Sequence, residues 1–289
     1  MNNPSTIKAC LQQAQLLLND ISDSSRLDAE VLLAFVMQKN RTWLYTWSDK
    51  IPSPDQLQQF NQLVSQRQQG TPIAYLTGEK EFWSLPLQVS PATLIPRGDT
   101  EILVEVALEL AQTLQQKNPQ EQIRILDLGT GTGAIALALA SELPTAKITA
   151  VDKMPQAVEL AEKNRAALGF KNVTVLQSDW FSAIALQKFH VIVSNPPYID
   201  EQDPHLKQGD VRFEPLTALV APNQGLADIQ HIAEHAKQYL LPNGFLCVEH
   251  GWQQADAVQS VFTQSGYVGV KTVKDYGGND RVTVASFLS

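Results

Sequence analysis

The sequence has few cysteines and no long apolar run. Cys10 and Cys247 are the only cysteines in 289 residues, too few and too far apart to indicate a disulfide framework, so we expect a reducing compartment. No segment approaches the roughly 20 apolar residues of a membrane span. Residues 1–20 lack the basic start and apolar run of a secretion signal. These absences predict a cytoplasmic protein with no membrane partner.

The sequence is also poor in positive charge. It has 22 Lys and Arg against 30 Asp and Glu, a net charge of −8. Because phosphate neutralisation supplies most non-specific affinity for nucleic acid, this balance argues against a long nucleic-acid footprint, although discrete basic patches are compatible with it. At 44% hydrophobic residues, the chain can bury one large core, or a large one and a small one.

Residues 1–75 predict a helical domain without strands. Apolar residues recur at helical spacing over 6–18, 25–37 and 54–69. Ser53-Pro54-Asp55-Gln56 supplies a capping hydroxyl, a proline at the first helical position and a glutamine three residues after the cap. The aromatic run 43–47 is most simply core packing of a short helix, with contact to a partner as the alternative. Within residues 76–98, the segment 80–94 alternates and is broken by Pro86 and Pro91, which predicts an extended hairpin linker.

From residue 99 to 289, helical and strand patterns alternate. Strands are expected at 123–128, 147–152, 173–178, 189–194 and 244–248, with helices between them. The last two strands, 268–273 and 281–287, are joined by the turn signal at 276–280 and should run antiparallel. The pattern predicts a doubly wound α/β sheet of seven strands, mostly parallel with an antiparallel edge. Ligands of such sheets bind at the carboxyl ends of the strands.

Asn195-Pro196-Pro197-Tyr198 follows a buried strand and so should lie at that edge. Two prolines stop the strand and keep Asn195 out of helical geometry, so the loop is stiff and its carboxamide projects. The Asn195 side-chain oxygen and the Pro196 backbone carbonyl offer two acceptors to a planar NH2 group, and the Tyr198 ring can cover its face. This predicts a pocket for an amide or exocyclic amine nitrogen. The alternative is a proline-rich turn that only closes a strand.

A glycine turn precedes this loop in the chain. Gly129-Thr130-Gly131-Thr132-Gly133 lies between a predicted strand and a predicted helix, where glycines allow the backbone to approach a ligand and the helix start offers free N–H groups. Asp152 ends the next strand and is placed to bind the two hydroxyls of a ribose. Because Ala134 can replace the third glycine of a dinucleotide fingerprint, a nicotinamide cofactor is formally compatible with this turn.

Asp179 and Trp180 help to decide whether the cofactor is a nicotinamide dinucleotide or another adenine-containing molecule. They follow the strand 173–178 and supply a carboxylate for an adenine amino group and an aromatic face for the adenine plane. A dinucleotide enzyme has no need of an Asn-Pro-Pro-Tyr loop after the next strand. The sequence resembles the S-adenosylmethionine-dependent amino-methyltransferases in four features that follow one another at the ends of successive strands. These are the glycine turn, Asp152, Asp179-Trp180 and the Asn-Pro-Pro-Tyr loop.

Two further segments narrow the resemblance. Together with Asn195–Tyr198, the segments Leu94–Glu101 and Val211–Pro215 resemble the release factor glutamine methyltransferase family over essentially the whole chain. The resemblance implies transfer of a methyl group from S-adenosylmethionine to the glutamine amide of the Gly-Gly-Gln motif of peptide chain release factors, leaving S-adenosylhomocysteine, without a metal and with no direct need for nucleic acid. One departure is visible: the family usually has proline at the position of Gly98, which leaves the path of that loop open.

The resemblance also implies roles for individual residues. The catalytic residues are Asn195, Pro196 and Tyr198. The helical domain at 1–75 is expected to recognise the release factor, and 99–289 to form the methyltransferase domain. The residues expected to bind the cofactor are Gly129, Thr130, Gly131, Thr132, Gly133, Asp152, Asp179, Trp180 and Asn195. Those expected to bind the substrate are Asn195, Pro196, Pro197, Tyr198, Arg212, Phe213 and Glu214.

Three other interpretations remain open. An adenine-N6 methyltransferase shares the Asn-Pro-Pro-Tyr pocket but should carry a basic recognition surface. A non-catalytic scaffold that binds the cofactor should have lost Asn195 or the glycine turn, and both are intact. His231-Ile232-Ala233-Glu234-His235 matches an inverted zinc-protease pattern, but no further ligand accompanies it, so we expect a solvated helix face and no metal.

Glu249 faces the ligand edge and is a candidate for the pocket wall.

Overall fold

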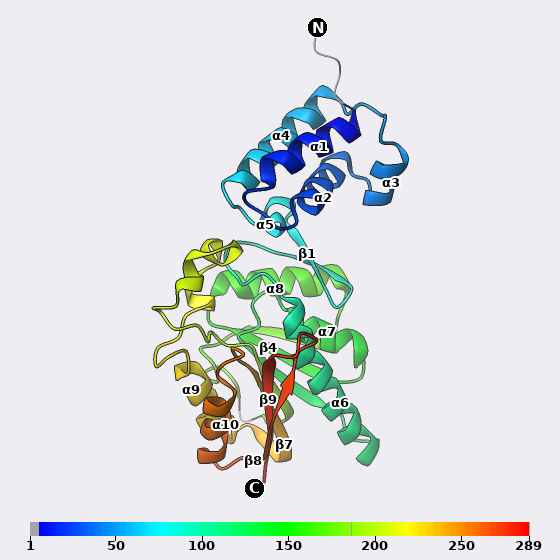
Figure 1. Ribbon diagram of the computed structural model, residues 1–289. Helices are drawn as coiled ribbons and strands as arrows, with labels where there is room; N and C mark the ends of the chain where they lie inside the picture. Colours follow the sequence, from blue (N-terminus) through cyan, green and yellow to red (C-terminus); the bar gives the residue numbers. More distant parts are fainter. Residues whose placement is uncertain (1–5, 186, 289) are drawn as a thin grey trace. The chain divides into compact units, whose positions relative to one another are not determined.

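Two regions of apolar patterning give two units. The computed structural model describes residues 6–185 and 187–288, which divide into a helical unit and a sheet unit (Figure 1). The helical unit holds the described residues up to Glu79 together with Lys207–Phe213, and the sheet unit holds the rest. Of the expected hairpin linker 76–98, residues 76–79 belong to the helical unit and residues 80–98 to the sheet unit, and a short segment far along the sequence belongs to the helical unit.

The helical unit is built from amphipathic helices whose apolar sides meet. Leu32, Leu33 and Phe60 are buried in its core. Ser53 caps α4 as the sequence predicts: its hydroxyl accepts from the Gln56 N–H at 3.2 Å, and the Gln56 side chain accepts from the Ser53 N–H at 2.9 Å. The helices are α1 (Ile7–Leu18), α2 (Ser25–Met37), α3 (Arg41–Thr46), α4 (Pro54–Gln68) and α5 (Ile73–Thr77).

A buried arginine fixes the segment Lys207–Phe213 within the helical unit. Arg67, near the end of α4, donates to Asp28 Oδ2 at 2.8 Å and to Asp210 Oδ1 at 3.0 Å. Loss of either carboxylate would weaken the pairing of a guanidinium that is almost fully buried. The 3-10 helix η3 (Asp210–Phe213) is thus bound to α4 through Arg67, which Asp28 of α2 also binds.

The sheet unit contains one large sheet with the order β5-β4-β3-β6-β7-β9-β8. Strands β3 to β7 pair in parallel, and β9 runs antiparallel to both β7 and β8. The predicted seven-stranded doubly wound sheet is therefore confirmed, with its antiparallel pair at one edge. The strands are β3 (Arg124–Leu128), β4 (Lys147–Asp152), β5 (Val173–Gln177), β6 (Phe189–Ser194), β7 (Leu240–Glu249), β8 (Val268–Lys274) and β9 (Asp280–Phe287).

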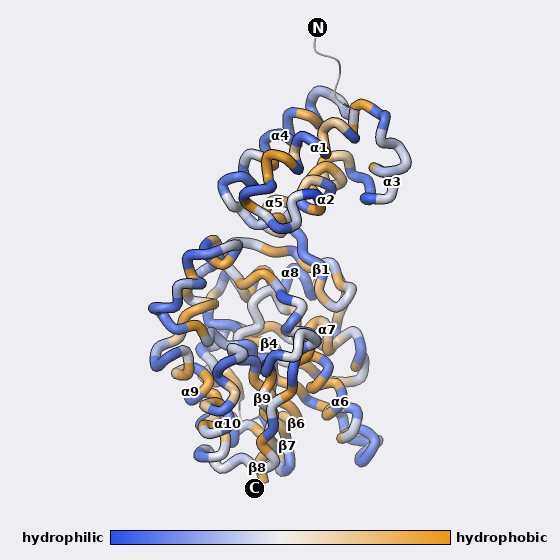
Figure 2. The backbone as a smooth tube through the Cα atoms, in the orientation of Figure 1, coloured by the Kyte–Doolittle hydropathy of each residue, from blue (hydrophilic) through white to orange (hydrophobic). Residues whose placement is uncertain are grey.

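Side chains of the central strands alternate between two apolar cores. In β6, Val191 and Val193 join the core that includes α6 and α7, whereas Ile192 joins the core that includes α9 and α10. Figure 2 shows these strands as predominantly apolar. With both faces covered, a ligand site is expected at the carboxyl ends of the strands. The helices are α6 (Glu101–Lys117), α7 (Ala134–Glu142), α8 (Pro155–Leu168), α9 (Ala227–Ala236) and α10 (Ala255–Gln264).

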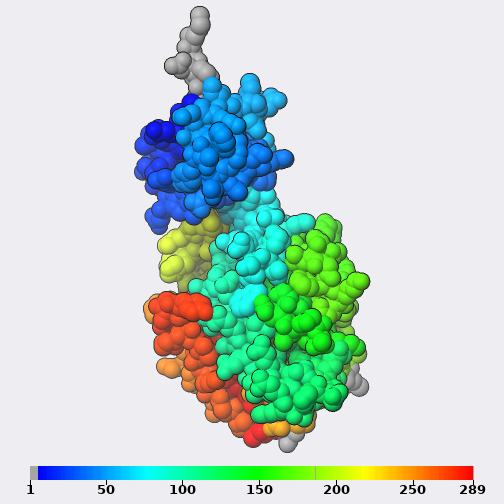
Figure 3. Space-filling view, turned by 90° about the vertical axis from the view of Figure 1, so that its right-hand side faces the viewer, coloured from blue at the N-terminus to red at the C-terminus, as the bar shows by residue number. Residues whose placement is uncertain are grey.

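The C-terminal hairpin β8–β9 lies beside the start of α6 (Figure 3, red and teal-green). Tyr276, in the hairpin turn, donates to Glu105 Oε1 at 2.5 Å. Arg281, at the start of β9, pairs with Asp99 Oδ2 at 3.2 Å, within the 3-10 helix η1 (Gly98–Thr100) that precedes α6. These contacts bring the start of α6 to the carboxyl end of β7.

A small hairpin packs on the sheet unit from residue 80 onward. Its strands are β1 (Glu79–Phe82) and β2 (Leu85–Gln88), and Trp83 and Ser84 form the turn with φ of +54° and +59°. Glycine or asparagine usually signals such a turn, so the sequence predicted the strands but not the turn. The remaining 3-10 helices are η2 (Pro204–Lys207) and η4 (Leu216–Ala218). Within 6–185 and 187–288, no helix is long and apolar enough to cross a membrane.

Candidate active site

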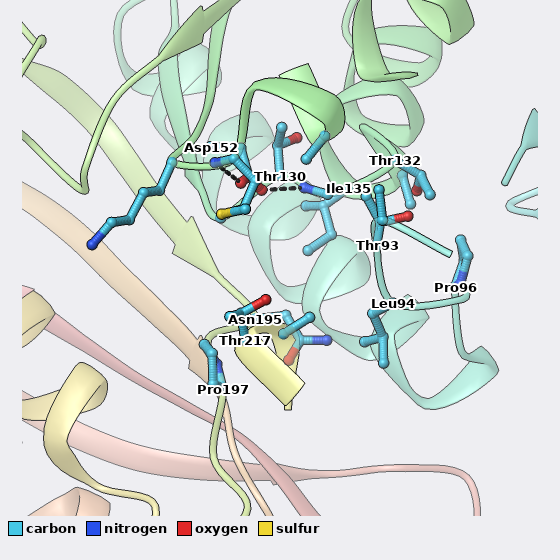
Figure 4. Close-up of a pocket in the computed structure, with 18 of the residues that line it drawn as sticks. Thr93, Leu94, Pro96, Thr130, Thr132, Ile135, Asp152, Asn195, Pro197 and Thr217 are labelled. Carbon is cyan, nitrogen blue, oxygen red and sulfur yellow. Dashed lines mark hydrogen bonds between the residues drawn. The ribbon is translucent and has the colours of Figure 1, made fainter. Parts of the chain in front are cut away.

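A cavity of about 390 Å³ opens at the carboxyl ends of the parallel strands. In Figure 4, Asp152 and Thr130 lie toward one end, and Asn195, Pro197 and Thr217 toward the other. Its wall includes nine of the predicted site residues: Gly129, Thr130, Gly131, Thr132, Asp152, Asp179, Trp180, Asn195 and Pro197. The glycine turn and the Asn-Pro-Pro-Tyr loop, 66 residues apart in their first members, therefore face one cavity.

The three glycines of the turn have different surroundings. All three adopt left-handed backbone geometry, with φ of +71° at Gly129, +56° at Gly131 and +86° at Gly133. Gly129 and Gly131 line the cavity. A Cβ at Gly133 would instead meet side-chain atoms of Leu137 at 3.1 Å and Ala161 at 3.4 Å. The structure therefore places Gly133 at the packing of α7 on α8, not in the cavity wall.

A buried acid holds the turn from behind. Asp127, in β3, is fully buried and accepts from the Thr130 hydroxyl at 2.6 Å. Burial raises the pKa of Asp127 to about 7, although the bonds from Thr130 and the Ala136 N–H act to lower it. Sequence reasoning assigned Asp127 no role. Its signal was an acidic residue between the apolar residues Leu126 and Leu128 of the strand.

Asp152 is oriented by two backbone amides before any ligand is considered. Its Oδ2 accepts from the Gly131 N–H and its Oδ1 from the Met154 N–H, both at 2.9 Å. Burial raises the pKa of this carboxyl above its usual range, and these bonds oppose the shift. Each oxygen keeps a second lone pair, so a carboxylate fixed in this way can still accept from a pair of hydroxyl groups.

Trp180 and Asp179 form the rim beside the glycine turn. Trp180 has a φ of +49°, which is uncommon for a bulky residue, and a Cβ on Gly129 would lie 3.7 Å from its ring. Asp179 Oδ2 pairs with the Lys153 ammonium at 2.9 Å, and both side chains are largely exposed. The structure thus brings the predicted aromatic face to the cavity and gives the predicted carboxylate a cationic partner.

Asn195 lies at the opposite end of the cavity wall. It follows β6, whose last residue Ser194 donates from its hydroxyl to the Leu128 carbonyl at 2.8 Å. The Asn195 Nδ2 donates to Thr100 Oγ1 at 3.1 Å. With its nitrogen bound to Thr100, the amide directs its oxygen elsewhere. Pro197 also lines the cavity, whereas the Pro196 side chain is buried outside the lining.

Tyr198 supports the loop from behind. Its hydroxyl donates to Glu249 Oε1 at 3.3 Å, and its carbonyl accepts from the Gln254 side chain at 2.9 Å. Burial is the main cause that raises the pKa of Tyr198 above its usual range. Gly225 approaches this carbonyl so closely that a Cβ would lie 2.0 Å from it. Tyr198 is absent from the cavity lining, whereas the sequence predicted that its ring would cover the acceptor.

The predicted substrate residues 212–214 divide between the two units. Glu214, in the sheet unit, is buried, accepts from the Arg97 guanidinium at 2.6 Å and accepts from the Ile95 N–H at 3.0 Å. Arg212 and Phe213 belong to the helical unit, where the guanidinium carbon lies 5.0 Å from the Phe213 ring centroid. Glu214 therefore fixes the segment that forms part of the cavity wall ahead of η1.

The histidine motif 231–235 lies on α9. His231 and His235 stack with ring centroids 4.2 Å apart on α9, and the His231 ring lies 6.4 Å from that of Trp180. Among the described residues there is no group of three His, Cys, Asp or Glu side chains that could hold a metal ion.

Sequence reasoning missed part of the wall and its support. The cavity is also lined by Ala92, Thr93, Leu94, Pro96, Arg97 and Thr100, of which 94–100 entered the sequence analysis only through the family resemblance. Thr217, Ala218 and Val220, in and after η4, also line it, and no pattern in their segment indicated this. Asp228, at the start of α9, lines it as well.

Comparison with known proteins covers both units. A family model for the PrmC N-terminal domain matches residues 9–78, and one for the methyltransferase small domain matches 106–211. A release factor glutamine methyltransferase from Salmonella typhimurium is 57% identical over 277 residues, 96% of this chain and 97% of that protein. One from Shewanella oneidensis is 52% identical over 288 residues, 100% of this chain and 98% of that protein. The solved hMettl16 catalytic domain matches with a TM-score of 0.55 at 15% identity, over 78% of this chain and 82% of that one, which supports the fold alone.

Proposed function

This chain belongs to the release factor glutamine methyltransferase family, and we propose that it methylates the side-chain amide nitrogen of the glutamine in the Gly-Gly-Gln motif of peptide chain release factors. The observation that carries the proposal is the orientation of Asn195 at the cavity wall. Its nitrogen is bound to Thr100 at 3.1 Å, so its oxygen is the part of the amide left to accept from a substrate N–H.

The opposite end of the cavity fits S-adenosylmethionine, whose sulfonium supplies an electrophilic methyl group. A volume of about 390 Å³ lies within the range of roughly 300–1,000 Å³ for small-molecule sites. Gly129 and Gly131 let the backbone approach the ligand closely. The fixed Asp152 carboxylate would accept from the ribose hydroxyls, and the Trp180 face would cover the adenine. Asp179 would take the adenine amino group by giving up part of its pairing with Lys153.

Positioning is the main contribution expected from the protein at the acceptor end. An amide nitrogen is a poor nucleophile because its lone pair is delocalised into the carbonyl. Holding nucleophile and methyl group in line contributes about 7–11 kcal/mol, far more than the ~0.5–1.5 kcal/mol of one neutral hydrogen bond. The Asn195 side-chain oxygen and the Pro196 carbonyl would each accept from one N–H of the glutamine amide. This fixes its plane and polarises the N–H bonds as positive charge develops, and the proton leaves to water.

A labelling experiment tests this function against its alternatives. The protein is incubated with methyl-labelled S-adenosylmethionine and either a release factor or a DNA or RNA duplex. Label should enter the release factor, at the motif glutamine when the product is mapped by mass spectrometry. A release factor with that glutamine replaced by alanine is the matched control and should stay unlabelled. Label in the nucleic acid alone would favour an adenine methyltransferase, and cofactor binding without transfer to any substrate would favour a scaffold.

We further propose that the helical unit recognises the release factor through an aromatic and basic surface around α3. Tyr45 and Trp47 are each 47% exposed. The Lys50 ammonium lies 4.5 Å from the Trp47 ring centroid, and the Arg26 guanidinium carbon lies 5.8 Å from that of Tyr45. Exposed tryptophan, tyrosine and arginine are the residue types that dominate the energetics of protein interfaces. Arg26 is paired with Glu30 at 3.0 Å, whereas Lys50 makes no ion pair among the described residues, so its ammonium suits an acidic group on a partner surface.

Substitution of Trp47 tests this surface. Trp47→Ala should raise KM for intact release factor by about 10-fold or more, the effect of losing an interface hot spot. KM for a short Gly-Gly-Gln peptide and Kd for the cofactor should not change. Leu16→Ala is the control, because Leu16 is an apolar residue that is 73% exposed but lies away from this surface. It is near the C-terminal end of α1, whereas the N-terminal end of that helix adjoins Lys50, through the bond from the Ile7 N–H to the Lys50 carbonyl. Equal effects of the two substitutions on KM would contradict a specific surface.

A further inference from the structure

Glu249 is a buried acid at the carboxyl end of β7, behind the acceptor loop. Its side chain is 1% exposed, and in the sheet it lies opposite Val282 of β9. It does not line the cavity, so it does not touch a ligand there. Burial of an acid at this depth destabilises the fold unless neighbouring groups donate hydrogen bonds to it or compensate its charge.

A chain of side-chain contacts connects Glu249 with Asn195. The Tyr198 hydroxyl donates to Glu249 Oε1 at 3.3 Å, which ties the acid to the loop that carries Asn195. The Thr100 hydroxyl lies close enough to Glu249 to act to lower the pKa of that acid, and Glu249 Oε2 is a buried oxygen without a hydrogen-bond partner of its own among the described residues. The Thr100 oxygen accepts from Asn195 Nδ2 at 3.1 Å. Thr100 is 5% exposed. Asn195, Thr100 and Glu249 are supplied by three separate parts of the chain.

Thr100 has a single hydroxyl proton, and this determines which group donates and which accepts in the contacts between Glu249 and Asn195. An ionised carboxylate accepts only, so Thr100 must donate to Glu249. The Thr100 oxygen is then an acceptor, and the group that it accepts from is the NH2 of Asn195. The opposite arrangement, with Thr100 donating to the Asn195 oxygen, would turn the amide over. Its NH2 would then face the NH2 of the substrate, where two donors oppose each other.

We infer that Glu249 is a positioning residue for methyl transfer, acting through the Thr100 hydroxyl to keep the oxygen of the Asn195 amide, rather than its nitrogen, toward the acceptor. The inference rests on the proposed glutamine methyltransferase function. It assigns Thr100 and Glu249 a joint task, orienting one amide, in addition to their part in packing.

The charge state of Glu249 should therefore control turnover. Burial raises its pKa to about 7, while hydrogen bonding from Thr100 and Tyr198 and the charge of Arg281 on β9 act to lower it, and Asp99 on η1 raises it. Once protonated, Glu249 can donate to Thr100, which reverses the donor and acceptor roles between Glu249, Thr100 and Asn195. The pH at which turnover declines on the acid side should thus follow the ionisation of Glu249.

Three substitutions test the inference with intact release factor and saturating cofactor. Thr100→Val removes the hydroxyl while keeping the shape, Thr100→Ser keeps the hydroxyl, and Glu249→Gln replaces the acceptor by a group that can donate. Glu162→Gln is the matched acid-to-amide control, since Glu162 pairs with Arg165 on the exposed side of α8. For each variant, kcat, KM, the cofactor Kd by calorimetry and the kcat profile from pH 5.5 to about 9 are measured, a range that brackets the raised pKa.

The expected result is a kcat effect without a binding effect. Thr100→Val and Glu249→Gln should each lower kcat by about 10–100-fold, as misplacement of a positioning group does, with KM and Kd within about threefold of wild type. Thr100→Ser should restore kcat to within about threefold, and Glu249→Gln should lose the acid decline seen in wild type and in Glu162→Gln.

Two results would overturn the inference while leaving the proposed function intact. One is a Glu249→Gln enzyme that methylates glutamine with wild-type kcat and an unchanged pH profile. The other is equal activity of Thr100→Val and Thr100→Ser, which decides the matter even where Glu249→Gln fails to fold. Absence of glutamine methylation by the wild-type protein would instead refute the proposed function.

Discussion

The two ends of the cavity are held in place in different ways. At the glycine-turn end, the supporting contacts span shorter stretches of sequence: Thr130 donates to Asp127 three positions away, and Asp152 accepts from the Met154 N–H two positions away and from the Gly131 N–H across 21 positions. At the Asn195 end, support is long-range: Asn195 donates to Thr100 across 95 positions, and Tyr198 donates to Glu249 across 51.

This difference reflects what each end must do. The glycine turn needs a particular backbone shape, and residues within the turn and at the end of the next strand can provide it. Asn195 needs a particular side-chain orientation, and in a buried setting that requires a hydrogen-bond partner which is itself oriented. We therefore expect substitutions at the glycine-turn end to weaken binding, and substitutions at the Asn195 end to reduce turnover.

The largest effect should come from Asn195→Ala. Loss of the side-chain acceptor should lower kcat for glutamine methylation on the order of 10²–10³-fold, the usual cost of removing one preorganised hydrogen-bonding group. Because Asn195 is remote from Asp152 in the cavity, the cofactor Kd from calorimetry should change by less than about threefold. A turnover assay with release factor measures kcat. Near-normal turnover would refute the assignment of Asn195, and a large loss of cofactor affinity would remove the distinction between the two ends.

Asp152→Ala should have the reciprocal effect. Its carboxylate is expected to bind the ribose hydroxyls, so its loss should weaken cofactor binding by roughly 1.5–3 kcal/mol, the range for hydrogen bonds to a charged group. Asp152→Asn keeps one oxygen for the Gly131 or Met154 N–H and should lose less. Isothermal calorimetry gives both dissociation constants. Unchanged affinity in Asp152→Ala would mean that the ribose is held by other residues.

The fold could be predicted from sequence because its signals are local and repeated. Apolar runs such as Val191–Val193 marked the central strands, and the Ser53–Gln56 cap marked the start of α4. The turn at Trp83-Ser84 could not be predicted, because neither residue type favours a positive φ. The membership of Lys207–Phe213 in the helical unit could not be predicted either, since it depends on Arg67 meeting an acid 143 positions later.

The site could be predicted only where motif and role coincide. Gly129, Gly131, Asp152, Trp180 and Asn195 were proposed from motifs, and the structure brings them to one cavity. A motif gives the position of a residue but not the direction of its side chain. For this reason Gly133, placed at a helix contact, and Tyr198, placed behind the loop, differ from the expected arrangement. Thr100 becomes part of the site only through its contact with Asn195, which is 95 positions away in the sequence.

A pH experiment compares the buried acids of the two ends. Burial raises the pKa of Asp127 to about 7 from 3.8, so between these values the folded protein keeps a proton that the unfolded chain releases. The contribution of Asp127 to stability is thus greatest at low pH and falls as pH rises toward 7, by up to about 1.4 kcal/mol per pH unit. Asp127→Asn should flatten the dependence of the unfolding free energy on pH, measured by urea denaturation between pH 5 and about 8.

Glu249→Gln should flatten the same dependence, because burial raises the Glu249 pKa to about 7 as well. Glu162→Gln serves as the control, since Glu162 is largely exposed and bound to Arg165. A flattening in Asp127→Asn alone would mean that the acid at the Asn195 end is ionised at a lower pH than its burial indicates. That result would separate the two ends electrostatically as well as by the range of their contacts.

The smallest effect is expected at Gly98, where the chain departs from its family just ahead of Thr100. Arg97 has φ −107° and ψ 144°, the extended geometry that a residue before proline requires. Gly98 begins η1, and a Cβ built on it has no neighbour within 4 Å. Gly98→Pro should therefore stabilise the protein by about 0.4–1 kcal/mol through lower entropy of the unfolded chain. Urea denaturation measures this gain, and Gly98→Ala, which restricts the chain less, should show a smaller one. Since Thr100 is expected to orient Asn195, kcat reports whether the substitution changes the path of the loop that carries Thr100. A stabilised variant with unchanged kcat would mean that glycine and proline at this position give the same loop path. A lower kcat would mean that the loop depends on the glycine.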